Sequence, residues 1–124
     1  MAIRLLLVDD DAGFRSTLRQ LLEQRVETQV LGEAGSGEEA IRLTDDLRPD
    51  VVLMDLAMPR MNGLEATRQL KTRWPELAVV ILTVHDEEVY RRTAIAAGAT
   101  AFLQKKMLGV DLWPTLVRIV NRNG

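Results

Sequence analysis

Short apolar runs alternate along this chain with longer segments in which apolar residues recur every three or four positions. The runs are IRLLLV at 3–8, QVLGEA at 29–34, VVLMD at 51–55, AVVILT at 78–83 and AFLQ at 101–104. Runs of this length predict strands, and their nearly continuous apolar character indicates a parallel sheet that is buried on both faces. The second run predicts the weakest strand of the five.

The segments between the runs have the spacing of amphipathic helices. The first predicted helix has Phe14, Leu18, Leu21 and Leu22 on one face. The second begins with the capping-box pattern SGEE at 36–39 and continues to about Leu47. Three more helices are predicted at about 64–74, 87–97 and 112–121. Asp86 is expected to cap the fourth helix, Gly98 to end it, and Pro114 to lie in the first turn of the fifth.

Five strands that alternate with five helices predict an α/β fold. We expect a flavodoxin-like, doubly wound (βα)5 domain. Its five-stranded parallel sheet has the order 2-1-3-4-5, numbered along the chain, with helices on both faces.

Four of the five predicted strands lead into a polar residue that could be reactive. Asp9 and Asp10 follow the first strand, Asp55 ends the third, Thr83 ends the fourth and Lys105 follows the fifth. Ligands of open α/β sheets bind outside the carboxyl ends of the strands, where the strand order reverses. That point lies between the first and third strands, so these side chains are predicted to converge on one crevice.

Three clustered carboxylates indicate a cation site. No Lys or Arg is adjacent to them in the sequence, so a metal is the natural counterion, and an all-oxygen site suits Mg²⁺ or Mn²⁺. Mg²⁺ is usually held by one or two carboxylates plus phosphate oxygens, which leaves a third carboxylate free to accept a phosphoryl group. With Lys105 and Thr83 at the same edge, the set predicts aspartyl-phosphate chemistry. Asp11 is expected to cap the first helix instead.

Composition narrows the classes of function. The 124 residues fit one domain, and a net charge of -2 lacks the basic character of a nucleic-acid binder. The absence of cysteine and the single histidine, His85, exclude disulfides, thiolate sites and multi-histidine metal sites. We find neither a signal peptide nor a run near the roughly 20 apolar residues of a membrane span. The expected location is the cytoplasm, with no membrane partner.

Four stretches, taken together, resemble the receiver domain of two-component response regulators. They are LLLVDDDAGFR at 5–15, PDVVLMDLAMPRMNGLE at 49–65, VILTVHDEE at 80–88 and AAGATAFLQK at 96–105. The resemblance covers nearly the whole chain in order, so residues 1–124 are expected to form one receiver domain. It is strongest to regulators that carry a LuxR-type helix-turn-helix output domain.

The resemblance implies a role for each residue of the crevice. Asp55 would be the phosphoacceptor, and Mg²⁺ would be held by Asp9, Asp10, Asp55 and the backbone carbonyl of Ala57. The family is a set of phosphorylated switches with at most slow self-dephosphorylation, so the chain is not expected to be an enzyme.

The resemblance also implies a switch. Thr83 and Lys105 would contact the phosphoryl group, and Thr83 and Phe102 would then turn inward. This movement would remodel the surface of the predicted helix at 87–97, the strand at 101–104 and the last helix.

Some positions depart from the commonest family pattern. Lys105 is followed by Lys106 rather than proline, so we expect a trans peptide bond there. Phe102 lacks the hydroxyl of the equally common tyrosine, so a switch at this position would depend on packing. Ala57 and His85 occupy positions that lie beside the path of the hydrolytic water in the family, so the resemblance implies that they would tune dephosphorylation.

The family implies a sensor histidine kinase as phosphodonor partner, or a small acyl phosphate. A homodimer on phosphorylation is also implied, through the last two helices or through the first and the last. DNA would be reached only through an output domain that this chain lacks. The alternative is a stand-alone single-domain receiver that acts by protein–protein interaction.

Three other functions compete with the switch. A haloacid-dehalogenase-type phosphatase would need a general acid where Ala57 stands. A flavodoxin-like cofactor binder would need a Ser/Thr/Gly-rich first loop, whereas DDDAG is acidic and repels phosphate. A degenerate receiver used only as a scaffold would not be expected to retain the whole set of acidic, hydroxyl and lysine residues.

Overall fold

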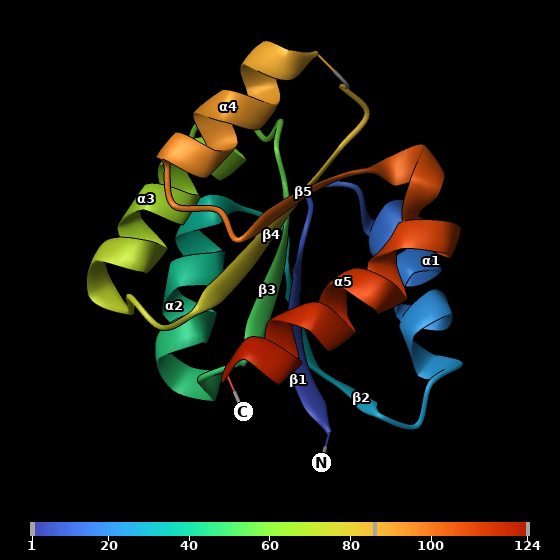
Figure 1. Ribbon diagram of the computed structural model, residues 1–124. Coiled ribbons are helices and arrows are strands. Elements are labelled where there is room, and N and C mark those ends of the chain that lie inside the picture. The colour runs from blue at the N-terminus through green and yellow to red at the C-terminus, as the bar shows by residue number, and fades with distance from the viewer. Residues whose placement is uncertain (1, 86, 124) are drawn as a thin grey trace.

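Five parallel strands form a single sheet in this computed structural model, which describes residues 2–85 and 87–123 (Figure 1). The strands are β1 (Ile3–Val8), β2 (Thr28–Ala34), β3 (Val51–Asp55), β4 (Ala78–Thr83) and β5 (Ala101–Gln104). Their order is β2-β1-β3-β4-β5, and each neighbouring pair is parallel. The predicted doubly wound fold and strand order are therefore confirmed.

Helices cover both faces of the sheet. They are α1 (Ala12–Glu23), α2 (Gly37–Leu47), α3 (Gly63–Arg73), α4 (Glu88–Ala96) and α5 (Leu108–Asn123), the last preceded by a 3-10 turn at Lys105–Met107. Figure 1 shows α2, α3 and α4 on one face of the sheet and α1 and α5 on the other. Within the described ranges, no helix has the length and apolar character needed to cross a membrane.

The alternation of side chains along each strand divides the core into two layers. In β1, Leu6 and Val8 pack with the layer under α2, α3 and α4, while Leu5 and Leu7 pack under α1 and α5. The strands β3 and β4 divide in the same way. Nearly every residue of the three central strands is therefore buried, which explains why these strands read as continuous apolar runs.

Side chains cap the starts of the first three helices. The Asp11 carboxylate accepts from the backbone N–H groups of Gly13 and Phe14, as predicted. Ser36 Oγ accepts from Glu39 N–H at 3.1 Å, while the Glu39 carboxylate reaches back to the N–H of Gly35 rather than of Ser36. The predicted cap at Asp86 lies outside the described residues.

The last helix differs from the sequence prediction. It begins at Leu108, so Pro114 lies inside the helix and not in its first turn, and that prediction was wrong. Proline lacks the N–H that would bond to the carbonyl four residues earlier, at Val110. Pro114 and Val110 are both exposed, so water can satisfy that carbonyl and the helix continues.

Candidate functional site

The carboxyl-terminal edge of the sheet brings the five predicted side chains together. Asp55 is the last residue of β3 and Thr83 the last of β4, while Asp9 and Asp10 follow β1 and Lys105 follows β5. Because β1, β3, β4 and β5 are successive neighbours in a parallel sheet, these positions form a short row at one edge. The strand order thus places the residues as the sequence predicts.

Three carboxylates lie close enough to share one cation. Asp9, Asp10 and Asp55 each offer an oxygen within 4.8 Å of the others. Asp9 is 2% exposed and Asp55 is 7% exposed, whereas Asp10 is exposed. The group therefore has two buried carboxylates and one exposed at its mouth.

Lys105 bridges two of these acids. Its Nζ lies 2.8 Å from Asp9 Oδ2 and 3.0 Å from Asp55 Oδ1, and 4.1 Å from the centre of the Phe14 ring. The peptide bond before Lys106 is trans, as predicted. The sequence predicts that Lys105 and a metal both supply positive charge here, but not that the lysine bonds to Asp9 as well as to Asp55. The lysine neutralises one of the three charges and leaves two for a cation.

Burial and charge shift the ionisation of two of these groups. Burial raises the pKa of Asp55, with Asp9 and Asp10 adding repulsion, although the ammonium of Lys105 acts in the opposite direction. Burial also disfavours the charged form of Lys105, but its bonds to Asp9 and Asp55 outweigh burial and raise the pKa of the lysine. Asp55 therefore lies in an environment that favours added positive charge.

The loop after β1 is held from several sides. The N–H of Asp9 donates to the carbonyl of Ala34 on β2 at 3.0 Å. The carboxylate of Asp9 accepts from the N–H of Asp11 at 2.8 Å, and the guanidinium of Arg15 donates to the carbonyl of Asp9. These bonds hold the backbone that carries Asp9 and Asp10 in a fixed position after β1.

Thr83 and Phe102 lie beneath the site. The hydroxyl of Thr83 is buried and accepts from the N–H of His85 at 3.0 Å. Phe102 on β5 is 8% exposed and packs in the core layer under α4. Both residues are therefore buried in this structure.

Ala57 and His85 occupy the two loops beside the crevice. Ala57 is exposed and carries no polar group. The His85 side chain is 40% exposed, with its Nδ1 3.9 Å from Glu87 Oε2 and its ring centre 4.9 Å from that of Tyr90. Ala57 and His85 line one shallow hollow with Tyr90.

Sequence reasoning missed three residues that shape the site. A methyl group on Gly63 would overlap the carbonyl oxygen of Asp55, so only glycine lets α3 begin there. Arg15 bonds to the loop at Asp9, and the ring of Phe14 lies against Lys105. The motif PRMNG signalled a turn at Gly63, but periodicity carried no signal for the other two contacts.

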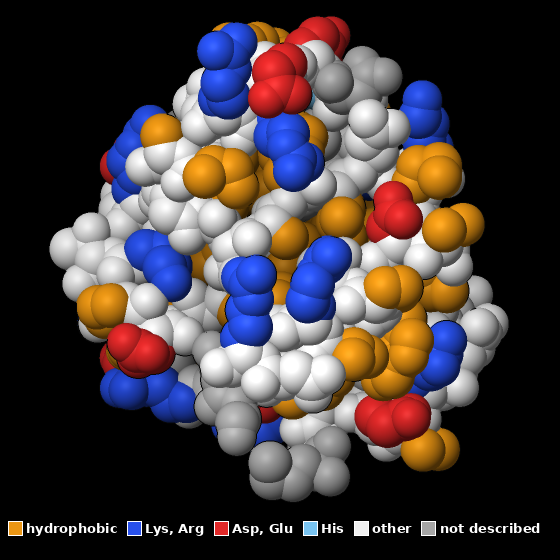
Figure 2. All heavy atoms as spheres, in the orientation of Figure 1, with side chains coloured by type: hydrophobic (Ala, Val, Ile, Leu, Met, Phe, Trp, Pro, Cys, Tyr) orange, Lys and Arg blue, Asp and Glu red, His pale blue; other side chains and the backbone are white. Residues whose placement is uncertain are grey.

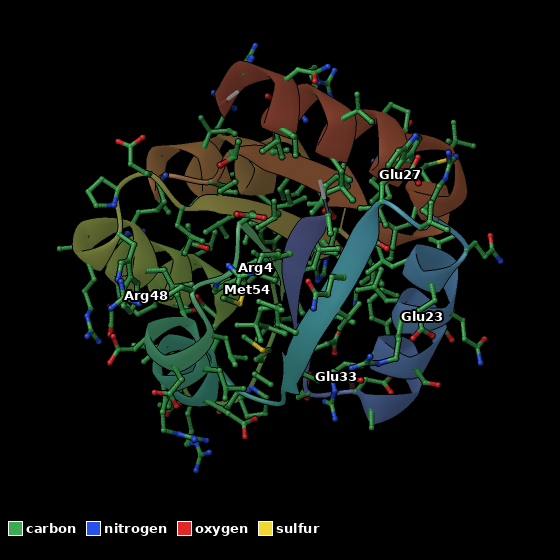
Figure 3. The ribbon with its side chains drawn as sticks, turned by 90° about the horizontal axis from the view of Figure 1, so that it is seen from below. Arg4, Glu23, Glu27, Glu33, Arg48 and Met54 are labelled. Carbon is green, nitrogen blue, oxygen red and sulfur yellow. The ribbon has the colours of Figure 1, made fainter. Side chains whose placement is uncertain are left out.

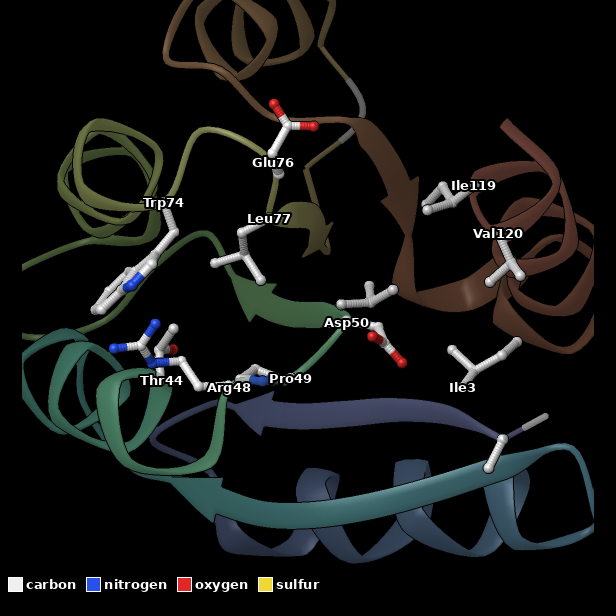
Figure 4. Close-up of a pocket in the computed structure, with 12 residues that line it drawn as sticks. Ile3, Thr44, Arg48, Pro49, Asp50, Trp74, Glu76, Leu77, Ile119 and Val120 are labelled. Atoms are coloured by element: carbon white, nitrogen blue, oxygen red, sulfur yellow. The ribbon is translucent and has the colours of Figure 1, made fainter. Parts of the chain in front are cut away.

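A separate apolar cavity of about 410 Å³ lies at the opposite edge of the sheet (Figure 4). Ile3 and Val120 line one side of it, and Trp74 and Leu77 line the other. Thr44 is also in its wall. Because the strands separate this cavity from the carboxylates, it plays no part in the chemistry of the candidate site.

Comparison with known proteins identifies the family to which the chain is related. The response regulator receiver domain model matches residues 5–115. The transcriptional regulatory protein DegU of Brevibacillus brevis is 36% identical over 122 residues, which cover 98% of this chain and 51% of DegU. The response regulator VraR of Staphylococcus aureus is 40% identical over 114 residues, which cover 90% of this chain and 54% of VraR.

A solved structure has the same fold throughout. It is a LuxR-family two-component response regulator from Aurantimonas sp. SI85-9A1, with a TM-score of 0.94 and 32% identity, and the match covers 98% of this chain and 87% of that one. The chain therefore belongs to the response regulator receiver domain family of two-component systems. It spans about half the length of the curated relatives it matches.

Proposed function

We propose that this chain is a Mg²⁺-dependent phosphoacceptor switch that is phosphorylated on Asp55 by a sensor histidine kinase. The observation that carries the proposal is the bridge from Lys105 to Asp9 and Asp55, with the carboxylate of Asp10 beside them. This arrangement combines a buried nucleophile, a fixed positive charge and an acidic pair, which are the groups that phosphoryl transfer to a carboxylate requires.

The donor set fits Mg²⁺. Its members are the carboxylates of Asp9, Asp10 and Asp55, to which the resemblance adds the backbone carbonyl of Ala57, so all the donors are oxygens as Mg²⁺ and Mn²⁺ prefer. The two charges that Lys105 leaves unneutralised match a divalent ion. When bound, Mg²⁺ supplies positive charge to the carboxylates and to the oxygens of the incoming phosphoryl group.

Asp55 acts as the nucleophile. One of its oxygens forms a bond to phosphorus while the bond from phosphorus to the donor's imidazole nitrogen breaks. The nitrogen leaves with the bonding electrons and takes up a proton. The ammonium of Lys105 lies 3.0 Å from Asp55 Oδ1, so it is placed to stabilise the negative charge of the phosphoryl oxygens once they are bound to Asp55. We expect no turnover beyond slow hydrolysis, and His85 is a polar group in one of the loops beside the crevice.

The new phosphoryl oxygens attract the hydroxyl of Thr83, and Phe102 follows by packing. Phe102 and Leu103 of β5 line a groove of about 540 Å³ that is shared with α4 and α5. Figure 2 shows Lys and Arg side chains gathered on this face. Arg91 of α4 and Arg118 of α5 line the groove. Movement of Phe102 would therefore change the surface that α4, β5 and α5 present to partners.

Transcription is the expected output. Relatives such as DegU are named as transcriptional regulators and are about twice as long as this chain. An output segment, and not the receiver, would contact DNA, and phosphorylation would favour a homodimer. The alternative is a single-domain receiver that acts by binding other proteins in the cytoplasm.

Incubation with radiolabelled acetyl phosphate tests the proposal. The parent chain should gain label with Mg²⁺ and lose that gain with EDTA, because the acids repel the donor without a cation. Asp55→Ala should stay unlabelled. Asp46→Ala, which changes an exposed acid on α2, is the matched control and should label normally. Label that persists on Asp55→Ala would refute the proposal.

A further inference from the structure

Arg15 on α1 connects the acidic loop to the end of β2. Its Nη1 donates to the carbonyl oxygen of Asp9, and its Nε lies 2.9 Å from Glu33 Oε1. We propose that Arg15, held in place by Glu33, is a positioning residue that sets the cation affinity of the Asp9–Asp10 site. This inference rests on the proposed function, because it concerns the same cation site.

The bond from Arg15 acts on the backbone that carries both acids. The carbonyl of Asp9 belongs to the peptide group between Asp9 and Asp10, so a donor on that oxygen fixes the plane from which Asp10 projects. Asp9 is also held by Lys105. Asp10 is exposed, and among the described residues no side chain bonds to its carboxylate. Its position therefore depends on the backbone that Arg15 holds.

Glu33 fixes the direction of Arg15. Figure 3 shows Glu33 at the end of β2 that lies beside α1. One carboxylate oxygen bonds Arg15, and the other lies 2.7 Å from Nε of Arg19. The bond from Arg19, together with that from Arg15, lowers the pKa of Glu33, so the carboxylate remains ionised. The side chain of Arg15 is only 19% exposed, and its guanidinium has few alternative directions.

Charge and position make opposite predictions for this residue. Arg15 carries a positive charge near a cation site, so its electrostatic effect alone weakens metal binding, and its removal should tighten binding. If Arg15 orients the acids, its removal should weaken binding despite the lost repulsion. Outer partners of metal ligands typically contribute tenfold or more to affinity. The sign of the change therefore distinguishes the two roles.

Mn²⁺ binding, followed by electron paramagnetic resonance without any phosphodonor, tests the inference on the full chain. Arg15→Gln is expected to weaken Mn²⁺ binding roughly tenfold. Arg15→Lys should recover part of the affinity, because an ammonium can still donate to the carbonyl of Asp9. Arg19→Gln is the matched control, because it also removes one positive charge. Arg19 contacts Glu33 as Arg15 does, but it makes no bond to the loop that carries Asp9 and Asp10. The affinity of Arg19→Gln should stay within about twofold of the parent.

A second pair of variants tests whether Glu33 acts through Arg15. Glu33→Gln should weaken Mn²⁺ binding less than Arg15→Gln does. The double variant Arg15→Gln/Glu33→Gln should be no weaker than Arg15→Gln alone, because two residues in one chain of contacts are not additive. Thermal melts without metal establish that each variant is folded. If Arg15→Gln lost stability but kept its Mn²⁺ affinity, Arg15 would have a purely structural role and the inference would be overturned.

The remaining outcomes separate this inference from the proposed function. Equal or tighter Mn²⁺ binding by Arg15→Gln, or equal weakening by Arg19→Gln, would overturn the positioning role and leave the phosphoacceptor proposal intact. If the parent bound no Mn²⁺, or if Asp9→Asn bound it as well as the parent, the cation site itself would fail. The proposed function would fail with it.

Discussion

At the residue scale, the phosphoacceptor candidate carries an energetic cost. Asp55 is 7% exposed and lies beside two other acids, and within residues 2–85 and 87–123 its one ion-pair partner is Lys105. Burial raises the pKa of Asp55 above its ordinary value of 3.8. Its ionised form therefore destabilises the folded state at neutral pH when no cation is bound.

We predict that Asp55→Asn melts at a higher temperature than the parent at neutral pH in EDTA. The difference in melting temperature should be largest above the raised pKa that Asp55 has in the folded state. It should shrink as the pH falls through that pKa and vanish below 3.8, because Asp55 is then neutral in both the folded and the unfolded parent. Mg²⁺ should stabilise the variant less than the parent. Differential scanning calorimetry across this pH range checks the prediction, with Asp46→Asn as the exposed control. A lower melting temperature for Asp55→Asn in EDTA would contradict it.

Two buried threonines make a second residue-scale comparison. Thr44 on α2 is 1% exposed, and its hydroxyl has no hydrogen-bond partner in the described part of the chain. Thr67 on α3 is fully buried, and its hydroxyl donates to the carbonyl of Gly63 at 2.7 Å. An unsatisfied buried hydroxyl costs free energy, whereas a satisfied one stabilises the fold.

Thr44→Val should therefore raise the free energy of unfolding by about 1 kcal/mol, and Thr67→Val should lower it by about the same amount. Both substitutions keep a β-branched side chain on a helix, so the hydroxyl is the main change. Urea denaturation measures both. If the two variants change stability in the same direction, the assignment of their hydroxyl groups is wrong.

At the scale of elements, the start of α3 is fixed by the strand that carries Asp55. The N–H of Gly63 donates to the carbonyl of Leu56 at 2.8 Å, and a methyl group added at Gly63 would overlap the carbonyl oxygen of Asp55. Asn62 caps the helix through its side chain. The first turn of α3 therefore packs directly against the backbone of Asp55 and Leu56.

Gly63→Ala should destabilise the chain by roughly 1–3 kcal/mol or more, because the new methyl group must displace backbone. It should also slow labelling from acetyl phosphate, since the displaced backbone belongs to Asp55. Gly109→Ala is the control, because a methyl group there meets nothing within 4 Å. That change lies in the first turn of α5 and should be neutral or stabilising. Equal labelling rates for Gly63→Ala and the parent would contradict the coupling of α3 to Asp55.

Element types followed from the sequence because burial imposes clear periods. β1, β3, β4 and β5 match their predicted bounds, and β2 begins one residue earlier than predicted, at Thr28. The start of α5 was not predicted correctly, because proline is most often found in the first turn of a helix and Pro114 therefore favoured a later start. Pro114 is exposed, so water can bond to the carbonyl of Val110 that the proline leaves unpaired. That exposure depends on how the helix packs and could not be predicted from the sequence.

At the scale of the whole molecule, strand order explains why the site could be predicted. Once the order was inferred, the ends of β1, β3, β4 and β5 had to meet, and with them the acids, Thr83 and Lys105. The contacts between side chains could not be predicted in this way. Lys105 bridges Asp9 from 96 positions away, and Arg15 reaches the same loop from α1. Such contacts depend on side-chain length and direction in the folded state.

The central claim is that Asp55 is the residue that becomes phosphorylated. It is tested most directly by borohydride reduction of the acetyl-phosphate-treated chain, followed by peptide mass spectrometry, since an aspartyl phosphate is reduced to homoserine. We expect homoserine at position 55 in samples that contained Mg²⁺ and none in samples with EDTA. Homoserine at Asp9 or Asp10 instead, or an unmodified Asp55 in a chain that has gained label, would contradict it.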